Sequence, residues 1–541
     1  MKTFSFFMVL LLIAGCSGRR HDNQEHYYAK QAAMAPESVA LAPQPTLAGN
    51  VPGDAPQKPG EIGQKGEFNT EAYDHIVDNP FLLARQNPLS TFSIDVDTAS
   101  YANMRRFLNQ GQLPPAGAVR IEELINYFPY RYAPPTDEKP FAVHVEIASC
   151  PWNPEHRLAR IGLKGRDIDM TQRPLSNLVF LLDVSGSMMD SNKLPLLKEA
   201  MKMLVHKLTE NDRVAIAVYA GSEGLALPPT SCDKKEVILT AFDNLQAGGS
   251  TNAGSGIKLA YDVAIQNFIP KGTNRVILAT DGDFNVGITN QSDLISLIEE
   301  KAKSKVFLSV LGFGMGNYKD STLEKLADKG NGNYAYIDTL NEAKKVLVEQ
   351  LTGTLITIAK DVKIQIEFNP AQVSAYRLIG YENRLLRAED FKDDTKDAGE
   401  IGAGHTVTAL YEIVPVGKEI AIPDVDPLKY QQPKEASVSA QSDDLFTLKL
   451  RYKQPEGDAS VPMEFVIKDD RQTIEQSSGD MKFASSVAAF GMILRGSKHK
   501  GKASFEMVSR FAQEGRGQDP EGYRAEFIGL IEKAKALKQN P

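Results

Sequence analysis

The fold is decided by the stretch Leu181-Leu182-Asp183-Val184-Ser185-Gly186-Ser187-Met188. It closes an apolar run that begins at Asn177, and such a run predicts a fully buried strand. The sequence then changes abruptly to Asp, Ser and Gly, which are typical of a loop. In open α/β sheets, ligands bind in the crevice outside the carboxyl ends of the strands. We therefore expect a binding site at this loop.

Three side chains of this loop carry the oxygen donors that hard cations prefer. Asp183 offers a carboxylate, and Ser185 and Ser187 offer hydroxyls. Two later loops have similar compositions. Residues 248–252 (GGSTN) precede a helical pattern, and residues 280–283 (TDGD) follow a second apolar run. Both loops are expected to contribute to the same site.

The DxSxS loop, the Gly-Ser-Thr loop and the strand-terminal TDG, in this order, resemble a von Willebrand factor type A (VWA) domain. The resemblance implies a metal-ion-dependent adhesion site, where a bound cation contacts an acidic side chain of a partner protein. Its five positions fall on Asp183, Ser185, Ser187, Thr251 and Asp281. The implied cation is Mg²⁺, with Mn²⁺ or Ca²⁺ also possible. The alternative, that Asp183 and the serines only cap the following turn, does not call for ligands on other loops.

Residues 173–357, which we assign to the VWA domain, alternate strand and helix patterns. Strands are expected over 177–182, 213–220, 274–280, 306–312 and 333–338. Helices are expected over 194–208, 234–245, 252–268, 290–303, 320–329 and 341–356. This alternation predicts an α/β fold with a doubly wound, mostly parallel, Rossmann-like sheet.

Strand patterns also lie on both sides of this domain. They cover 141–149 and 158–164 before it, and 361–369, 373–381, 405–414, 445–453 and 462–468 after it. Strands that flank an α/β insertion predict that the two flanks pair into one β-sandwich. Helices are expected over 101–110, 120–127, 483–495, 505–513 and 522–537. We therefore place an N-terminal VWA-associated region at 69–172, and the remaining strands and a helical tail at 358–541.

Three segments outside the VWA pattern extend the resemblance. They are STFSIDVDTASYANMRRFL (90–108), RIEELINYFPY (120–130) and CPWNPEHRLARIGLKG (150–165). With the VWA pattern and the tail, they resemble the YfbK-like bacterial VWA lipoproteins over most of residues 70–540. This resemblance supports the architecture and implies no defined activity.

The N-terminus has the pattern of an export signal. Lys2 precedes an apolar run over residues 4–13, and Leu12-Ile13-Ala14-Gly15-Cys16 resembles a bacterial lipobox. We expect residues 1–15 to be removed and Cys16 to be lipidated; an ordinary signal peptide cleaved near Gly15 is the alternative. By resemblance, Ser17 after the cysteine implies the outer membrane, facing the periplasm or the surface. Residues 16–68, rich in Pro, Ala, Gln and Gly, predict a disordered tether.

Two further sets of residues leave alternatives open. Cys150 and Cys232 could form a disulfide between the sandwich and the VWA domain if their Cα atoms come within about 7 Å. Asp95 and Asp97 could form a second cation site. Capping and surface roles are favoured for this pair, because no other ligand cluster is visible nearby.

Composition narrows the function classes. The net charge of -8 gives no basic footprint for nucleic acid, and the eight His show no zinc-ligand spacing. Gly312–Gly316 is GxGxG, better explained by a turn than by a nucleotide site. We favour a non-enzymatic, cation-dependent binding module in the cell envelope. The alternatives are an envelope scaffold or chaperone-like subunit with a structural metal, and a hydrolase in which Asp283 would act as the base.

Overall fold

The computed structural model describes residues 71–169, 173–220, 223–249, 253–282, 291–420 and 437–539. The signal segment, Cys16, the whole of the expected tether and Thr251 lie outside these residues. Among the described residues, none of the helices combines the length and apolar composition needed to cross a bilayer.

The VWA sheet has six strands in the spatial order β10-β9-β8-β5-β6-β7. The strands are β5 (Ser176–Asp183), β6 (Arg213–Tyr219), β7 (Glu223–Ser231), β8 (Thr273–Thr280), β9 (Phe307–Phe313) and β10 (Tyr334–Ile337). All neighbours are parallel except β7, which is antiparallel to β6. The predicted doubly wound, mostly parallel sheet is confirmed. Every residue of the central strand β5 is buried, as its continuous apolar run predicts.

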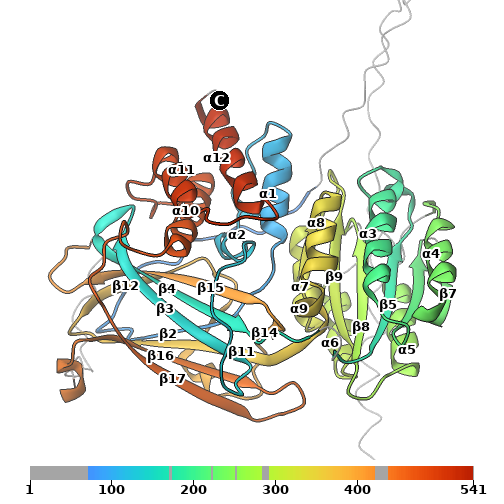
Figure 1. The fold of residues 1–541 in the computed structure, drawn as a ribbon, viewed down its shortest axis with the longest axis horizontal. Helices are drawn as coiled ribbons and strands as arrows, with labels where there is room; N and C mark the ends of the chain where they lie inside the picture. Colours follow the sequence, from blue (N-terminus) through green and yellow to red (C-terminus); the bar gives the residue numbers. More distant parts are fainter. Residues whose placement is uncertain are drawn as a thin grey trace, which may run out of the picture. The chain divides into compact units, whose positions relative to one another are not determined.

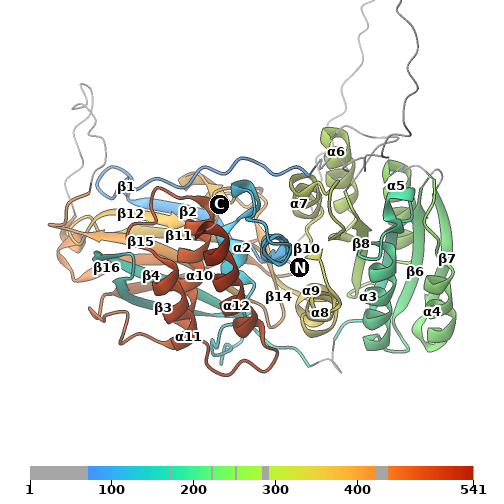
Figure 2. The same cartoon turned by 90° about the horizontal axis from the view of Figure 1, so that it is seen from above.

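Helices cover both faces of the VWA sheet (Figure 2). One face carries α3 (Leu194–Lys207), α4 (Lys235–Asp243) and α8 (Leu340–Lys344), and the other carries α5 (Ala253–Gln266), α6 (Gln291–Ala302) and α7 (Asp320–Lys329). The single helix expected over 341–356 is instead divided. After α8 come a π-helical turn, Lys345–Glu349, and α9 (Leu351–Leu355).

Two antiparallel sheets form the sandwich beside it (Figure 1). The first contains β1 (Leu82–Leu83), β3 (Phe141–Cys150), β4 (Asn153–Gly165), β12 (Val373–Ile379) and β15 (Thr406–Pro415). The second contains β2 (Leu89–Ser93), β11 (Thr357–Phe368), β13 (Leu385–Leu386), β16 (Asp444–Lys453) and β17 (Ser460–Lys468), with β14 (Gly399–Gly402) paired to β11. Each sheet combines strands from before and after the VWA domain, which confirms the pairing of the two flanks.

Five helices pack together on the first sheet of the sandwich (Figure 1). They are α1 (Ala99–Asn109), α2 (Ile121–Asn126), α10 (Gly479–Arg495), α11 (Phe505–Glu514) and α12 (Tyr523–Gln539). Phe128 lies at the centre of their aromatic core, with its ring 4.8 Å from Phe483 and 5.5 Å from Phe527 between centroids. The helical tail is therefore confirmed, and it shares a core with the two N-terminal helices.

Cys150 ends β3 and Cys232 begins a short 3-10 turn in the VWA domain. Both are buried, free thiols, so the disulfide that the sequence left open is not formed in this structure.

Candidate metal centre

Asp183, the last residue of β5, is fixed at the carboxyl end of the VWA sheet. One of its oxygens, Oδ1, accepts a hydrogen bond from the Ser185 backbone N–H at 2.9 Å. The other, Oδ2, accepts one from the hydroxyl of Thr280, which ends the neighbouring strand β8, also at 2.9 Å. The side chain has no exposed surface. The carboxylate is thus held where the two strands end side by side.

The two serines lie on the short turn that follows β5. Ser185 precedes a 3-10 turn, Gly186–Met189, and its hydroxyl lies 3.0 Å from that of Ser187. The Gly186 N–H donates to the Gly249 carbonyl at 3.0 Å, which brings the second loop against the first. The fifth expected position, Thr251, lies two residues beyond Gly249 and outside the described residues.

Asp281 directly follows β8 and is fully buried. Its Oδ2 accepts hydrogen bonds from the Asn317 side-chain amide at 2.9 Å and from the Lys193 ammonium at 3.2 Å. Lys193 also donates to Oδ1 of Asn317 at 3.1 Å and is 4% exposed. Asp281 therefore joins the site as expected, but sequence reasoning missed both of these partners.

Gly314 makes room for the Lys193 side chain. It has a φ of +78°, and a Cβ at this position would lie only 2.3 Å from Cε of Lys193. Gly312 lies within β9, and the chain turns after Phe313 with a positive φ at Gly314 and Gly316. No feature of the sequence points to the lysine.

The charges of the described site suit a divalent cation. Asp183 and Asp281 supply two buried carboxylates, and Lys193 compensates for one of them. Burial, and secondly the negative charge of Asp281, raise the pKa of Asp183 to about 6. A divalent cation would offset this charge, and carboxylate and hydroxyl oxygens are donors that Mg²⁺ accepts. The residues present therefore fit the metal that the fold implies.

Serine ligands are essential to this interpretation. Within the described ranges, there is no group of three or more His, Cys, Asp or Glu placed to hold a metal. Asp183 and Asp281 are therefore insufficient as carboxylate ligands alone. A cation at this position would therefore need the hydroxyls of Ser185 and Ser187 as ligands.

The favoured roles for Asp95 and Asp97 are wrong. The two side chains are only 4% and 5% exposed, and neither caps a helix through its side chain. Both pair with Arg384, at 3.2 Å and 3.4 Å, and Asp97 also accepts a hydrogen bond from the Tyr334 backbone N–H at 2.8 Å. Arg384 lies almost 300 residues later in the sequence, so these ion pairs could not be predicted from the sequence around the two aspartates. These carboxylates join the N-terminal segment to strand β10 of the VWA domain.

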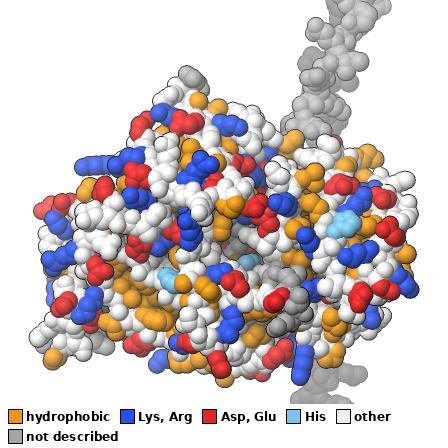
Figure 3. All heavy atoms as spheres, viewed as in Figure 1, with side chains coloured by type: hydrophobic (Ala, Val, Ile, Leu, Met, Phe, Trp, Pro, Cys, Tyr) orange, Lys and Arg blue, Asp and Glu red, His pale blue; other side chains and the backbone are white. Residues whose placement is uncertain are grey.

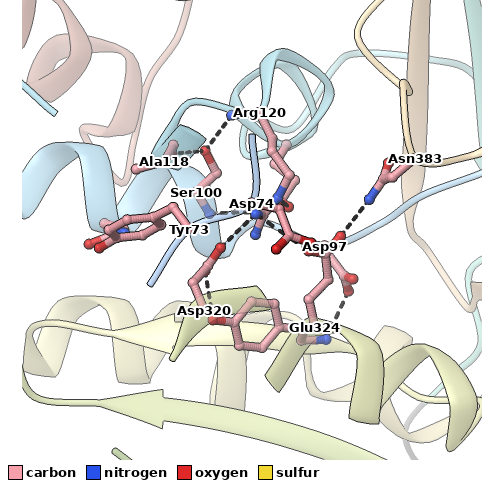
Figure 4. Close-up of polar contacts among 12 residues, drawn as sticks. Tyr73, Asp74, Asp97, Ser100, Ala118, Arg120, Asp320, Glu324 and Asn383 are labelled. Carbon is pink, nitrogen blue, oxygen red and sulfur yellow. Dashed lines mark hydrogen bonds and ion pairs between the residues drawn. The ribbon is translucent and has the colours of Figure 1, made fainter. Parts of the chain in front are cut away.

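A second buried ion-pair cluster strengthens this junction (Figure 4). Arg120, just before α2, reaches across to α7 and binds Asp320 at 2.6 Å and Glu324 at 3.4 Å. Its backbone N–H donates to the Ser100 hydroxyl of α1 at 2.8 Å. The VWA domain is therefore held against the N-terminal helices by charged contacts out of water.

Figure 3 shows Lys and Arg side chains mixed with Asp and Glu side chains over the described part of one face of the molecule.

Three family models match the chain. They are described as von Willebrand factor (residues 67–160), von Willebrand factor type A domain (177–350) and "Uncharacterized protein YfbK, C-terminal" (353–537). The chain is also 47% identical over 475 residues to "Uncharacterized protein YfbK" of Escherichia coli K12, covering 86% of this chain and 82% of that protein. The chain belongs to the YfbK family. It contains a VWA domain, a protein-interaction module that often depends on a metal.

More distant likenesses concern parts of this YfbK-family chain. Human inter-alpha-trypsin inhibitor heavy chain H1 is 25% identical over 260 residues, which are 44% of this chain and 28% of that protein. A solved von Willebrand factor type A protein from Catenulispora acidiphila is 14% identical, with a TM-score of 0.41; the match covers 74% of this chain and 92% of that one.

Proposed function

We propose that this chain is a non-enzymatic protein-binding module that requires a divalent cation and is tethered to a membrane. The observation that carries the proposal is the convergence of Asp183, Ser185, Ser187 and Asp281 at the ends of β5 and β8. Their oxygens belong to two adjacent strand ends, and the buried carboxylates outnumber the one ammonium beside them. A binding role for the cation accounts for this arrangement.

Each residue has a separate part in this proposal. Ser185 and Ser187, with Thr251, would hold the cation through neutral hydroxyls that leave its charge uncancelled. Asp183 and Asp281 would stabilise it from the buried side. When bound, Mg²⁺ would supply a positive charge and an exchangeable position for a Glu or Asp carboxylate of the partner.

The tether completes the proposal. Lipid on Cys16 would hold the chain on a membrane of the cell envelope. By resemblance, Ser17 after the cysteine favours the outer membrane. Residues 16–68 would let the binding site reach a partner away from the lipid surface.

Binding can be tested by affinity capture from detergent-solubilised envelope with the tagged full-length chain. One sample contains Mg²⁺, a second contains EDTA, and a third uses the Ser185→Ala, Ser187→Ala double variant in Mg²⁺. Ser296→Ala, an exposed serine on α6, is the matched control. A partner retained only by the wild type and the control in Mg²⁺ would support the proposal. A partner retained equally in all four samples would favour a scaffold with a structural metal.

The hydrolase alternative has a separate test. A general base must lie within hydrogen-bond reach of the water it activates, and Asp283, the expected candidate, lies outside the described residues. The full-length chain is incubated with generic ester and phosphate substrates in Mg²⁺. We expect no turnover; turnover that disappears in the double serine variant would contradict the binding role.

A further inference from the structure

A cavity of about 380 Å³ lies away from the metal centre. It adjoins the edge strand β10 and its neighbour β9 in the VWA sheet, whereas the metal centre lies at the ends of β5 and β8. Its wall is completed by the π-helical turn and α9, by the loop before β15, by the segment after α2 and by Tyr523 of α12. Small-molecule sites have volumes of about 300–1,000 Å³, so this cavity is large enough for one.

Lys345, the first residue of the π-helical turn, lines this cavity with an unpartnered charge. The side chain is 2% exposed, and its Nζ makes no hydrogen bond. Nζ lies 3.0 Å from the centre of the Tyr127 ring and 5.4 Å from that of the Tyr523 ring, and neither ring accepts a conventional hydrogen bond from it. An ammonium has three N–H donors, and leaving them unpaired in the protein interior is costly. Burial accordingly lowers the pKa of Lys345 to about 7.

His405, which also lines the cavity, supplies a second unpaired polar atom. Its Nδ1 is buried and has no hydrogen-bond partner. Burial, and then the charges of Lys164, Lys345 and Arg275, lower the pKa of His405 to about 4. The ring is therefore neutral at neutral pH and lies in a positive field. Gly353 allows its close approach, since a Cβ there would lie 2.1 Å from the imidazole.

The other charges on the wall are already paired. Lys164 donates to Asp167 at 2.9 Å and to the Gly404 carbonyl at 2.7 Å. Glu349 accepts a hydrogen bond from the Tyr523 hydroxyl at 2.6 Å and pairs with Lys344 at 2.9 Å. Beyond the wall, Glu342 and Glu526 pair with Arg105, and Nζ of Lys345 makes no direct ion pair or hydrogen bond. A carboxylate of a ligand would pair with this nitrogen directly.

We propose that this cavity binds a small carboxylic acid. Its carboxylate would accept hydrogen bonds from Nζ of Lys345, and the ring of His405 would be a second polar contact. Phe128, Tyr130 and Val346 also line the cavity, so an apolar or aromatic body fits beside the charged group. Because Lys345 belongs to the VWA domain and His405 to the sandwich, the ligand would bridge the two.

Benzoate is a suitable probe, because it combines one carboxylate with an aromatic body. Its binding to the full-length chain is measured by calorimetry, beside the uncharged isostere benzamide and beside inorganic phosphate. We expect benzoate to bind more tightly than benzamide. Lys345→Met should weaken benzoate binding by about tenfold or more, since a charge-assisted hydrogen bond contributes about 1.5–3 kcal/mol. Lys301→Met, which removes a half-buried lysine of α6 paired with Asp262, should leave binding unchanged.

A crystal of the wild-type chain soaked with 4-bromobenzoate gives a readout that does not depend on the folding of any variant. The anomalous signal of bromine should lie in the cavity, with the carboxylate at Lys345. Equal binding of benzoate and benzamide, or no binding of benzoate, would overturn the proposal. Binding of phosphate without benzoate would overturn the assignment to a carboxylic acid.

Discussion

The ammonium nitrogen of Lys193 lies 3.2 Å from Oδ2 of Asp281, and both side chains are buried. Lys193 directly precedes α3, and Asp281 directly follows β8. The lysine therefore compensates a carboxylate of the metal centre when no cation is bound. The same positive charge opposes the entry of a cation, so it sets the affinity of the site.

Replacing Lys193 with Met should tighten Mg²⁺ binding. The variant removes a positive charge but keeps an unbranched side chain of similar length. Because the lost positive charge lies close to the buried carboxylates, we expect the affinity for Mg²⁺ to rise by about tenfold or more. Calorimetric titration of Mg²⁺ into the full-length chain measures it. Lys202→Met, on the exposed side of α3 where Lys202 pairs with Asp243, is the control. Unchanged or weaker Mg²⁺ binding by Lys193→Met would show that the lysine does not compete with the cation.

Gly314→Ala should destabilise the chain more than Gly316→Ala. Both glycines have a positive φ, of +78° and +87°, so both substitutions carry backbone strain. Only at Gly314 would the new Cβ clash with the Lys193 side chain, because nothing lies within 4 Å of a Cβ at Gly316. We expect an extra loss of about 1–3 kcal/mol in the free energy of unfolding, measured by urea denaturation. Equal losses of unfolding free energy in the two variants would mean that the Lys193 side chain moves away from the new Cβ at no energetic cost.

Arg105 of α1 links α8 of the VWA domain to α1 and to α12. Its guanidinium pairs with Asp338 and Glu342 next to and within α8, and with Glu526 of α12 at 3.1 Å. It also donates to the Tyr127 hydroxyl at 2.9 Å. Asp338, Glu342 and the arginine itself are nearly inaccessible to water.

Arg105→Met should therefore lower the free energy of unfolding by about 3–5 kcal/mol, because it leaves buried carboxylates unpaired. Urea denaturation of the full-length variant measures the loss. Arg510→Met, at an exposed position of α11, should change stability far less. A loss for Arg105→Met no larger than that for Arg510→Met would contradict the structural role of the cluster.

The shifted pKa of Glu122, in α2, should make the free energy of unfolding depend on pH. Glu122 is 1% exposed, and burial, followed by the nearby carboxylates of Glu382 and Asp95, raises its pKa to about 8. The folded chain thus binds this proton more tightly than the unfolded chain, whose glutamate has an ordinary pKa of about 4.5. The stabilisation is complete below the unfolded value and is lost as the pH rises through about 8.

Glu122→Gln should flatten this dependence, because its amide is neutral at every pH. The free energy of unfolding of the wild type should fall between about pH 4.5 and pH 8, and that of the variant should fall less. Glu475→Gln, at an exposed position, should keep the wild-type slope. Identical slopes in all three proteins would mean that Glu122 is ionised in the folded chain.

Regular hydrophobic patterns made most of the fold predictable. The buried run at β5 and the alternating segments of β3 and β15 each appear as strands close to their expected bounds. Strand β7 was missed because it is an antiparallel edge strand with much of its length exposed and two prolines, which weakens any strand pattern. The π-helical turn was missed because its composition resembles that of an ordinary helix.

The site was predictable only where its chemistry lies in short motifs. Asp183, Ser185, Ser187 and Asp281 follow strand patterns directly, and the structure brings them to adjacent strand ends. The role of Lys193 was not predictable, because in the sequence a lysine at the start of a helix looks like a solvent-exposed one. Its burial depends on Gly314, which is far away in the sequence and leaves room for its side chain. Long-range pairs such as Arg384 with Asp95 likewise leave no local signal.

Whether the DxSxS loop binds a divalent cation is tested most directly by growing crystals of the full-length chain with Mn²⁺ and measuring the anomalous scattering of the metal. We expect a single strong anomalous peak bounded by Asp183, Ser185 and Ser187. Crystals of the Ser185→Ala, Ser187→Ala variant should lack this peak. If saturating Mn²⁺ leaves this position without a peak, the loop does not hold a cation, and the proposed cation-dependent binding is wrong.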